Sequence, residues 1–577
     1  MRARLSAIVI MSVIAALAAI GAASRTAAKS TMRAPAGPCA SLENQTIAPA
    51  QIGLPTRGAT IVSAQLVPAS PLVTTQGRGA VLPIPEYCKV VGYIAPVDPG
   101  APRINFQVNM PTVWNGKLAQ MGGSGTNGVI PIALGARMGS GPESMPPDAP
   151  YAVSRGFVTY GSDSGHQNAP AAGRGAPAAA PTQQPPPDWM RNTEARNNLL
   201  FAQMKKTHDV TVALVKQLYD QPIRHSYYFG TSQGGREALI VVQRYPQDYD
   251  GVLAQLPAFA YTHQGVFDSL SRARAQAGDA WIPPAKVALI AKEVRRQCDA
   301  LDGIEDGLMG SYMACDRKFD PSVTPDSLSA LRCPDGKDTG DTCLSDAQIR
   351  AAEALHAPVK YPFPIYKGWT GMPGWEAGGE TRTNWKTLDS ATDANTPLGG
   401  NLALLVNDPS VKLLTVDLNK YRKEIQDFSA LGDATDPDLS AFQRRGGKLV
   451  IKVNTADYSV NPRAMYAYYD KIVTTMGQGT VDRFARLYVA IGIAHNGNVG
   501  TNPLTNERVP SYVDFIGMID DWVEKGTAPA DTQVLTSMVT SPPFTVNASL
   551  PMCRYPMYPR YNGTGDPKNA QSYRCTK

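Results

Sequence analysis

Residues 227–239, YYFGTSQGGREAL, decide the fold. The run that leads into them, HSYYF, is typical of a β-strand, and the residues behind them have the apolar spacing of a helix. Ser232 stands at the turn between the two, in a Gly-x-Ser-x-Gly pattern with Gly230 and Gly234. So sharp a turn admits only small flanking residues and lifts the serine hydroxyl out of the sheet. The pattern favours Ser232 as a nucleophile, and a purely structural turn is the alternative.

Strand and helix patterns on both sides of this turn predict the fold class. Residues 40–165 contain short runs that alternate apolar and polar positions, which indicate strands. Residues 189–219 have helical spacing and lead into the strand before Ser232. Alternation of strand, turn and helix predicts an α/β fold with a mostly parallel sheet.

The alternation lapses after GVLAQLPAFAY and returns at GGKLVIKVN. The simplest explanation is a sheet domain interrupted by an insertion between two of its strands. We therefore expect a core domain formed by residues 29–261 and 441–577, with a lid domain at residues 262–440.

The amino-terminal residues predict export. Arg2 and Arg4 precede an apolar run that ends in small alanines, which is the layout of a signal peptide over residues 1–28. Cleavage after Ala23 or Ala28 is expected, and an uncleaved membrane anchor is the alternative. No later stretch is apolar and long enough to span a bilayer. We expect a soluble mature protein that is secreted or periplasmic, with no membrane partner.

The chain has eight cysteines, which fits an exported protein. In an oxidising compartment an even number of cysteines indicates that they are paired in disulfides. Eight cysteines allow 105 pairings. Three neighbouring pairs would close short loops and are the natural expectation, which leaves one pair near the amino terminus. The expected pairs are Cys298 with Cys315, Cys333 with Cys343, Cys553 with Cys575, and Cys39 with Cys88.

Charge argues against a nucleic-acid partner. The chain has 55 basic and 49 acidic residues, a formal net charge of +6 that is spread along the sequence. Proteins that bind nucleic acid concentrate a larger excess of positive charge on one face.

Two residues near the carboxyl ends of later predicted strands complete a candidate catalytic triad. His495 follows the apolar run LYVAIGI, and Asp457 follows the run KLVIKVN. A serine hydroxyl needs a base to accept its proton, and the base needs an acid to hold its tautomer. The order Ser232, Asp457, His495 is the one that α/β-hydrolases use. A histidine and an aspartate with only loop roles are the alternatives, and His166 is the second candidate for the base.

The tetrahedral intermediate of such a reaction needs hydrogen-bond donors for its oxyanion. The amide of Gln233, next to the nucleophile, is one expected donor. The glycine-rich stretch LAQMGGSGTNG at residues 118–128 is expected to supply the other, with Gly123 preferred over Gly122. A glycine turn without a catalytic role is the alternative.

An acidic cluster in CDALDGIEDGLMG predicts a cation site. Asp299, Asp302, Glu305 and Asp306 crowd a short stretch whose like charges repel unless a hard cation neutralises them. The spacing is not that of an EF-hand loop. We expect structural calcium, and a solvated acidic turn is the alternative.

Seven segments, in order along most of the mature chain, resemble the tannase and feruloyl esterase family. The segments are GTSQGGREAL, CDALDGIEDGLMG, CLSDAQ, GWTGMPGWE, NTADYSVNP, GIAHNGNVG and CRYPMYPRYNGTGDPKNAQSYRC. The resemblance implies an α/β-hydrolase fold with a large inserted lid, the triad named above, and the same four disulfides. It also implies calcium in the lid, held by the carboxylates of Asp299, Asp302 and Asp306 and by the backbone oxygens of Ile304 and Leu308. Glu305 would then point elsewhere.

The chain departs from the family pattern at two positions. The family usually has a disulfide between a cysteine before the nucleophile and another after the catalytic histidine, and Thr231 and Asn496 stand there instead. A hydrogen bond between these two residues is one expected substitute for the disulfide.

The sequence therefore predicts a serine esterase that acts on a small aromatic ester of the gallate, hydroxycinnamate or terephthalate monoester type. Trp281, Trp369 and Trp375 in the lid are candidates to stack on the aromatic ring, with core packing as the alternative for each. A catalytically silent, calcium-stabilised binding protein and a peptidase or amidase on the same fold are the rival hypotheses.

Overall fold

A computed structural model describes residues 37–75, 79–134, 144–168, 188–380, 391–495 and 500–577. The predicted signal peptide, residues 1–28, and Asn496 lie outside these ranges. Within them, no helix is both long enough and apolar enough to cross a membrane.

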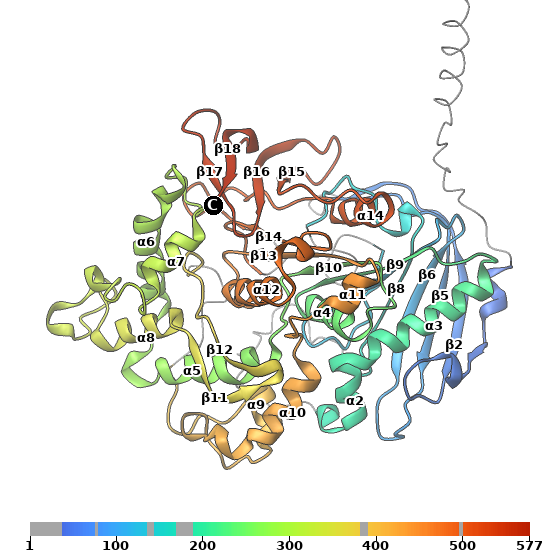
Figure 1. The fold of residues 1–577 in the computed structure, drawn as a ribbon, viewed down its shortest axis with the longest axis horizontal. Coiled ribbons are helices and arrows are strands. Elements are labelled where there is room, and N and C mark those ends of the chain that lie inside the picture. Colours follow the sequence, from blue (N-terminus) through green and yellow to red (C-terminus); the bar gives the residue numbers. More distant parts are fainter. Residues whose placement is uncertain (1–36, 76–78, 135–143, 169–187, 381–390, 496–499) are drawn as a thin grey trace, which may run out of the picture.

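One large sheet organises the molecule (Figure 1). It joins twelve strands in the order β1-β2-β5-β6-β8-β7-β9-β10-β13-β14-β16-β15. Their bounds are β1 Thr46–Ile47, β2 Ala59–Val67, β5 Tyr87–Ile94, β6 Ile104–Pro111, β7 Lys117–Met121, β8 Val158–Ser162, β9 His225–Thr231, β10 Gly251–Gln255, β13 Lys448–Asn454, β14 Ala485–Ala490, β15 Thr532–Met538 and β16 Val546–Arg554. Three small sheets pair β3 Val73–Thr75 with β4 Gly79–Val81, β11 Val359–Ile365 with β12 Trp369–Met372, and β17 Tyr558–Tyr561 with β18 Tyr573–Thr576.

The centre of the large sheet is parallel and both flanks are antiparallel. Strands β8, β7, β9, β10, β13 and β14 pair in parallel. Strands β1, β2, β5 and β6 pair antiparallel on one flank, and β16 and β15 do so on the other. The sheet is therefore mixed, whereas the sequence predicted a mostly parallel one. The link between β5 and β6 is too short for the crossover that parallel pairing requires, so these strands form a meander.

The helices of the core flank both faces of the sheet. They are α2 Thr193–Asn197, α3 Gln203–Leu218, α4 Gln233–Arg244, α11 Ser440–Arg444, α12 Pro462–Met476, α13 Gln478–Val481 and α14 Phe515–Lys525. On β10, Val252 and Ala254 join the hydrophobic cluster that includes α4 and α12, while Leu253 joins the cluster on the α14 side. Successive side chains of a strand point to opposite faces, so both faces of β10 are buried.

Helix ends in this core have identifiable caps. Asn461 accepts a hydrogen bond from the amide of Arg463 at the start of α12, where Pro462 occupies a position that needs no amide partner. Asp514 accepts from the amide of Gly517 at the start of α14, and Gly526 ends that helix with φ 70°.

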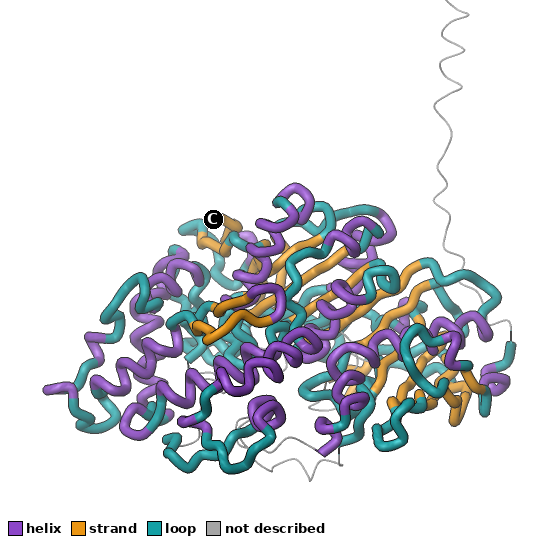
Figure 2. Tube along the Cα trace, turned by 60° about the horizontal axis from the view of Figure 1, so that its bottom comes forward, coloured by secondary structure: helices purple, strands orange, loops and turns teal. Residues whose placement is uncertain are grey.

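A mainly helical segment is inserted between the adjacent strands β10 and β13, at residues 262–440 (the inserted segment). Its helices are α5 Ser269–Ala275, α6 Pro284–Cys298, α7 Tyr312–Phe319, α8 Asp346–His356, α9 Gly400–Val406 and α10 Arg422–Gly432. Figure 2 shows most of this helical part lying beside the strands of the large sheet rather than across them.

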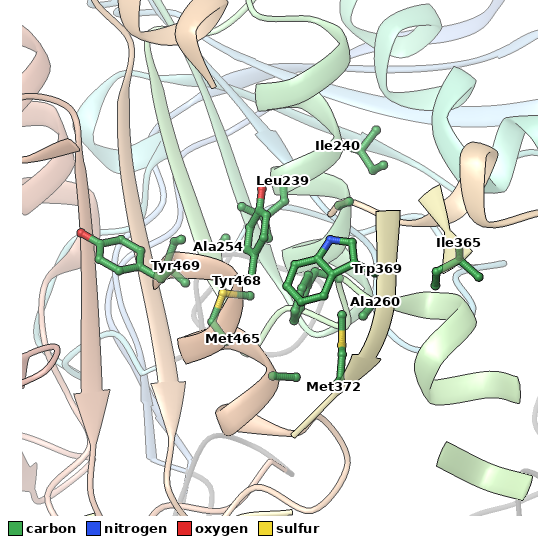
Figure 3. Close-up of a cluster of buried hydrophobic side chains, with 14 of the residues drawn as sticks. Leu239, Ile240, Ala254, Ala260, Ile365, Trp369, Met372, Met465, Tyr468 and Tyr469 are labelled. Carbon is green, nitrogen blue, oxygen red and sulfur yellow. The ribbon is translucent and has the colours of Figure 1, made fainter. Parts of the chain in front are cut away.

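The inserted segment packs on the core through a hydrophobic cluster (Figure 3). Trp369 and Met372 of β12 lie among Leu239 of α4 and Met465 and Tyr468 of α12. Burial of each such side chain contributes about 1.5–3 kcal/mol relative to exposure, so this contact fixes the segment on the sheet.

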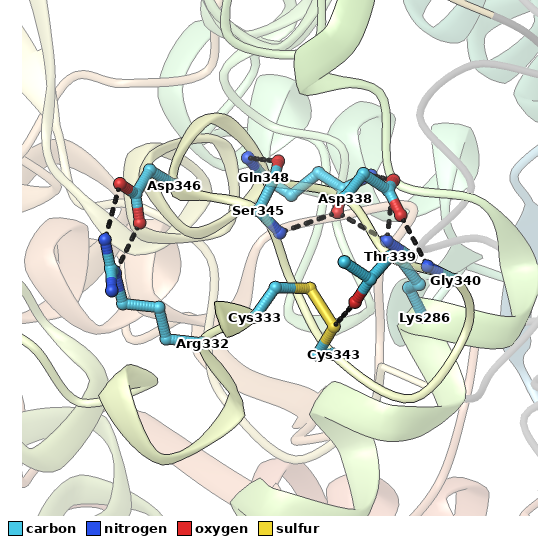
Figure 4. The surroundings of a disulfide bond; sticks show 10 residues. All are labelled: Lys286, Arg332, Cys333, Asp338, Thr339, Gly340, Cys343, Ser345, Asp346 and Gln348. Carbon is cyan, nitrogen blue, oxygen red and sulfur yellow. Dashed lines mark hydrogen bonds and ion pairs between the residues drawn. A yellow bond between two sulfur atoms is a disulfide. The ribbon is translucent and has the colours of Figure 1, made fainter. Parts of the chain in front are cut away.

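Four disulfides join the eight cysteines as expected from the sequence: Cys39–Cys88, Cys298–Cys315, Cys333–Cys343 and Cys553–Cys575. Polar contacts reinforce the smallest of these loops (Figure 4). Arg332 binds Asp346 through two nitrogens, at 2.6 and 3.0 Å, and buried Lys286 pairs with Asp338 at 2.8 Å.

Candidate active site

Ser232 lies at the junction of β9 and α4, in a backbone conformation that only a tightly built turn maintains. Its φ is 62° and its ψ is −117°. The serine amide donates to the carbonyl of Gln255, at 2.9 Å, and its carbonyl accepts from the amide of Ala258, at 3.1 Å. A side chain at Gly230 would place its Cβ 1.9 Å from the carbonyl oxygen of Gly234, which explains why glycine stands there. The turn has the geometry that the sequence pattern predicts.

Ser232, His495 and Asp457 form a continuous series of hydrogen bonds. His495 Nε2 lies 2.8 Å from Ser232 Oγ, and His495 Nδ1 lies 2.7 Å from Asp457 Oδ2. A carboxylate can only accept, so Nδ1 carries the hydrogen and Nε2 is the nitrogen that can accept the serine proton. The structure therefore brings together the three residues that the sequence selected as a triad.

Strand order explains how residues so distant in sequence meet. Ser232 follows β9, Asp457 follows β13 and His495 follows β14. These strands are parallel and lie in the order β9-β10-β13-β14, so their carboxyl ends share one edge of the sheet. Side chains at that edge of an open α/β sheet converge on one site.

Asp457 is held in place by the turn that follows it. The side chain is 2% exposed, and its Oδ1 accepts from the amides of Ser459 and Val460, at 2.8 and 2.9 Å. Two amide donors satisfy one carboxylate oxygen and leave the other to His495. The amide of Ala456 donates to the carbonyl of Ile493, at 3.2 Å, and so joins the aspartate loop to the histidine loop.

The glycine loop, defined here as residues 122–128, lies against the start of α4. The amides of its first two residues donate to protein acceptors, whereas one of them was expected to be available for an oxyanion. The amide of Gly123 donates to Glu237 Oε2, at 3.1 Å. The amide of Gly122 donates to the carbonyl of Phe229, at 2.9 Å. Both amides are therefore committed to other acceptors, and the prediction that Gly123 donates to an oxyanion is not supported by its hydrogen bonding. Sequence could not reveal this, because the direction of a loop amide depends on its tertiary acceptor.

The amide of Gln233 is the other expected oxyanion donor, and its contact with an oxyanion stays a prediction. It is the first residue of α4, and amides of the first helical turn have no partner within the helix. The positive end of the helix dipole adds to its attraction for an anion.

His166, the second candidate for the base, has a structural position. Its ring is 1% exposed and stacks on Trp189 with centroids 3.7 Å apart. Its Nε2 donates to the carbonyl of Thr126, at 2.8 Å, because a carbonyl only accepts. Burial lowers the pKa of His166 to about 4. His166 therefore holds the glycine loop and does not contact Ser232.

Thr231 precedes the nucleophile where the sequence resemblance led us to expect a cysteine. Its hydroxyl donates to Gln255 Oε1, at 3.2 Å. Because Asn496 lies outside the described residues, the expected bond between Thr231 and Asn496 stays a prediction.

A family model described as tannase and feruloyl esterase matches residues 88–576. The chain belongs to the tannase and feruloyl esterase family. An uncharacterized esterase of Agrobacterium fabrum is 34% identical over 572 residues, which cover 95% of each chain. Mono(2-hydroxyethyl) terephthalate hydrolase of Piscinibacter sakaiensis is 30% identical over 542 residues, covering 85% of each. A probable feruloyl esterase of Arthroderma benhamiae is 27% identical over 495 residues, covering 82% of each.

Solved structures agree on the fold of this tannase and feruloyl esterase family member. Feruloyl esterase B from Aspergillus oryzae aligns with a TM-score of 0.70 at 22% identity, over 91% of this chain and 98% of that chain. Tannin acyl hydrolase from Aspergillus niger aligns with a TM-score of 0.63 at 19% identity, over 90% and 92%. The protein has the α/β-hydrolase fold and is a carboxylic ester hydrolase of the tannase and feruloyl esterase type.

The inserted segment contacts the aspartate loop directly. Gln264 Nε2 donates to the carbonyl of Ser459, at 2.6 Å, and the hydroxyl of Tyr458 donates to the carbonyl of Glu376. Asn461 Nδ2 donates to the carbonyls of Pro373 and Gly374, at 2.9 and 3.1 Å. Sequence alone did not reveal these contacts, because nothing in the local pattern indicates a distant partner. Gln264 and Ser459 are about 200 residues apart, and Asn461 and Pro373 about 90.

Trp375, one of the three candidates to stack on a substrate ring, is 3% exposed and lies under the guanidinium of Arg272, so core packing accounts for it. Its ring stacks on Tyr458, the neighbour of Asp457, with centroids 5.4 Å apart, and its Nε1 donates to Asp268. Together with Ala258, Trp375 lines a small cavity behind the nucleophile turn. Trp369 belongs to the hydrophobic cluster with α12, so core packing accounts for it.

The acidic cluster forms a compact turn closed by Cys298–Cys315. Asp299 accepts from the amide of Gly307 and Asp302 from that of Gly310, at 3.0 and 2.8 Å. The amides of Ile304 and Leu308 donate to Asp302 and Asp306, at 3.3 and 3.0 Å, so all five residues expected to bind calcium lie on one turn. Glu305 is exposed.

The electrostatics of this turn fit a cation. Burial, with repulsion from Asp306, raises the pKa of Asp299 to about 6 and that of Asp302 to about 7. In the part of the chain that the structure describes, no lysine or arginine forms an ion pair with these carboxylates, and no three His, Cys, Asp or Glu side chains converge as a ready-made metal site. The carboxylates are oxygen donors of the kind that calcium prefers. In this structure each of them accepts a hydrogen bond from a backbone amide.

Proposed function

We propose that this protein is an exported serine esterase that cleaves an aromatic carboxylic ester through Ser232, His495 and Asp457. The observation that carries the proposal is the series of hydrogen bonds from Asp457 through His495 to Ser232, at 2.7 and 2.8 Å. Both distances lie within the range required for proton transfer in catalysis.

In the proposed mechanism, Ser232 Oγ attacks the ester carbonyl carbon while its proton passes to His495 Nε2. Asp457 stabilises the imidazolium that forms. His495 then returns the proton to the departing alcohol, and the acyl group stays on Ser232. A water molecule, deprotonated by His495 Nε2, then attacks the acyl carbon. The bond to Ser232 Oγ breaks, His495 returns the proton to Oγ, and the carboxylic acid leaves.

The oxyanion of the tetrahedral intermediate lies beside the amide of Gln233 in this proposal, with a second donor from the glycine loop. Since Gly123 donates to Glu237, the second donor is one of the amides that follow it in the loop.

An aromatic acyl group is the substrate class that fits best. Two relatives are named for feruloyl esters and for mono(2-hydroxyethyl) terephthalate. We propose gallate, hydroxycinnamate or terephthalate monoesters as candidates. Export is proposed from the signal-like amino terminus and the four disulfides.

Residues 262–440 are proposed to act as the lid of this site, because Gln264 and Glu376 contact the aspartate loop. Structural calcium is proposed in this lid at Asp299, Asp302 and Asp306, with the backbone oxygens of Ile304 and Leu308. Calcium would supply charge neutralisation there and takes no part in the reaction steps.

The test is hydrolysis of methyl gallate, methyl ferulate, a terephthalate monoester and p-nitrophenyl acetate by the purified mature protein. Ser232→Ala should lose all turnover, whereas Ser226→Ala, at the other end of β9, should retain it. Turnover by Ser232→Ala at the wild-type rate would remove Ser232 from the mechanism. A peptidase would instead cleave peptide substrates, and a binding protein would bind an aromatic acid without turnover.

A further inference from the structure

Glu237 is a buried carboxylate placed between the nucleophile helix and the glycine loop. It lies on α4 one turn after Gln233 and is 0% exposed. Its Oε2 accepts from the amide of Gly123, at 3.1 Å, and from the hydroxyl of Tyr228, at 2.7 Å. Its Oε1 accepts from Asn127 Nδ2. One carboxylate therefore binds both ends of the glycine loop.

The loop and the helix approach each other with no side chain between them. A Cβ on Gly122 would lie 2.6 Å from the Cα of Gly234, and a Cβ on Gly234 would lie 2.7 Å from the carbonyl oxygen of Gly123. Where backbones touch in this way, small shifts in the loop change its distance to the nucleophile turn directly. Glu237 lies on α4, the helix that begins directly after Ser232. Its hydrogen bond to Gly123 holds the loop at this distance from the helix.

The hydrogen bond to Glu237 also decides which loop amides remain for the reaction. Gly122 and Gly123 donate to Phe229 and Glu237. Among the described residues, the amides of Ser124, Gly125 and Thr126 have no hydrogen-bond acceptor. The far end of this free stretch is held by His166, which donates to the carbonyl of Thr126. The three unbonded amides therefore lie in a stretch whose two ends are hydrogen-bonded to the buried side chains of Glu237 and His166.

We propose that Glu237 is a positioning residue for ester hydrolysis: by binding the amide of Gly123 and the side chain of Asn127, it holds the free amides of the glycine loop beside Ser232 for the oxyanion. Glu237 touches neither the substrate nor the reacting atoms. The proposal rests on the proposed serine esterase mechanism, in which the loop supplies an oxyanion donor.

Two substitutions separate the hydrogen bond from the volume of the side chain. Glu237→Leu keeps most of the volume but offers Gly123 no acceptor. Glu237→Gln keeps an acceptor for Gly123, and its amide group can donate to Asn127 Oδ1, which has no partner among the described residues. Glu293→Gln, a buried carboxylate of α6 in the inserted segment, is the matched control.

The experiment measures kcat and KM for p-nitrophenyl acetate, together with the inhibition constant of phenylboronic acid, which adds to a catalytic serine as a tetrahedral anion. Glu237→Leu should lower kcat by about 10- to 100-fold and weaken boronate binding by a similar factor, with KM within about threefold. Glu237→Gln and Glu293→Gln should stay within about threefold of wild type in all three quantities. A merely structural role would not weaken boronate binding in a folded variant while leaving KM unchanged.

Glu237→Asp is the second variant, in case the leucine protein does not fold; it keeps the charge but draws the carboxylate back from Gly123. A folded leucine or aspartate variant with wild-type kcat and boronate affinity would overturn the positioning role alone. A wild-type protein that neither hydrolyses the ester nor binds the boronate would overturn the proposed function, and this inference with it.

Discussion

His495 Nε2 lies 2.8 Å from Ser232 Oγ although 263 residues separate them in the chain. The inserted segment accounts for most of this separation, yet β9, β13 and β14 remain in one parallel array. The sheet therefore tolerates a long insertion without moving the strand ends that carry the reactive groups, because the insertion begins after one parallel strand and ends before the next.

Substitution of Asp457 by asparagine should preserve the fold and remove most of the activity. An amide can donate to His495 Nδ1 and thereby favour the tautomer that cannot accept the serine proton, so kcat should fall by about 10⁴-fold with little change in KM. Steady-state kinetics measure this. Asp521→Asn, on the exposed face of α14, is the control and should leave kcat unchanged.

A side chain at Gly230 should abolish activity by distorting the nucleophile turn. In Gly230→Ala, the new Cβ would lie 1.9 Å from the carbonyl oxygen of Gly234, and backbone atoms cannot yield as a side chain can. Gly479→Ala in α13 meets no atom within 4 Å and should be neutral or slightly stabilising. Esterase activity and melting temperature distinguish the two; an active, stable Gly230→Ala protein would contradict the geometry.

Loss of individual disulfides should destabilise the protein in order of loop length. Cys39–Cys88 closes a loop with a sequence separation of 49, and Cys333–Cys343 closes one of 10. In the chain-entropy model the longer loop contributes about 1.4 kcal/mol more to the free energy of unfolding. Paired Cys→Ser variants compared by urea denaturation measure this difference. Equal losses would show that native contacts, such as the ion pairs in Figure 4, compensate for loop length.

Acid should destabilise the protein partly through His356. Burial lowers the pKa of His356 from 6.5 to about 4, so the unfolded chain binds a proton below pH 6.5 that the folded chain does not. This contribution to stability is present above pH 6.5 and is lost as the pH falls toward 4. His356→Gln removes it.

The difference in unfolding free energy, wild type minus His356→Gln, should therefore shrink by up to about 1.4 kcal/mol per pH unit between pH 6.5 and 4. Glutamine can still donate to the carbonyl of Trp375, the acceptor of the His356 ring. A difference that does not vary with pH would contradict this assignment.

Removal of calcium should lower the melting temperature more than it lowers kcat. A bound ion present at 100 times its dissociation constant stabilises the folded state by about 2.7 kcal/mol. Thermal melts with and without EGTA test the site. Asp302→Asn should lose the response, whereas Glu305→Gln, at the exposed neighbouring carboxylate, should keep it. Melting curves that EGTA does not shift would exclude the proposed ion.

The sequence anticipates that the three candidate triad residues meet, because each follows a strand in a strongly patterned segment. Ser232, Asp457 and His495 could be placed at strand ends from periodicity, and the parallel sheet then brings those ends together. The two antiparallel flanks were missed because alternation marks a strand but not the direction of its partner. The role of Gly123 was missed for a related reason: glycine spacing marks a tight loop, but only the tertiary contact with Glu237 decides where its amide points.

The hydrogen bonds from Gln264 and Tyr458, and those from Asn461 to Pro373 and Gly374, bear on how the enzyme can be simplified. Shortening the inserted segment would remove hydrogen-bond partners of the residues that directly follow Asp457. A minimal enzyme made from the sheet alone would need a redesigned turn after β13 before it could be expected to work. The inserted segment and the turn that holds Asp457 are therefore one structural unit.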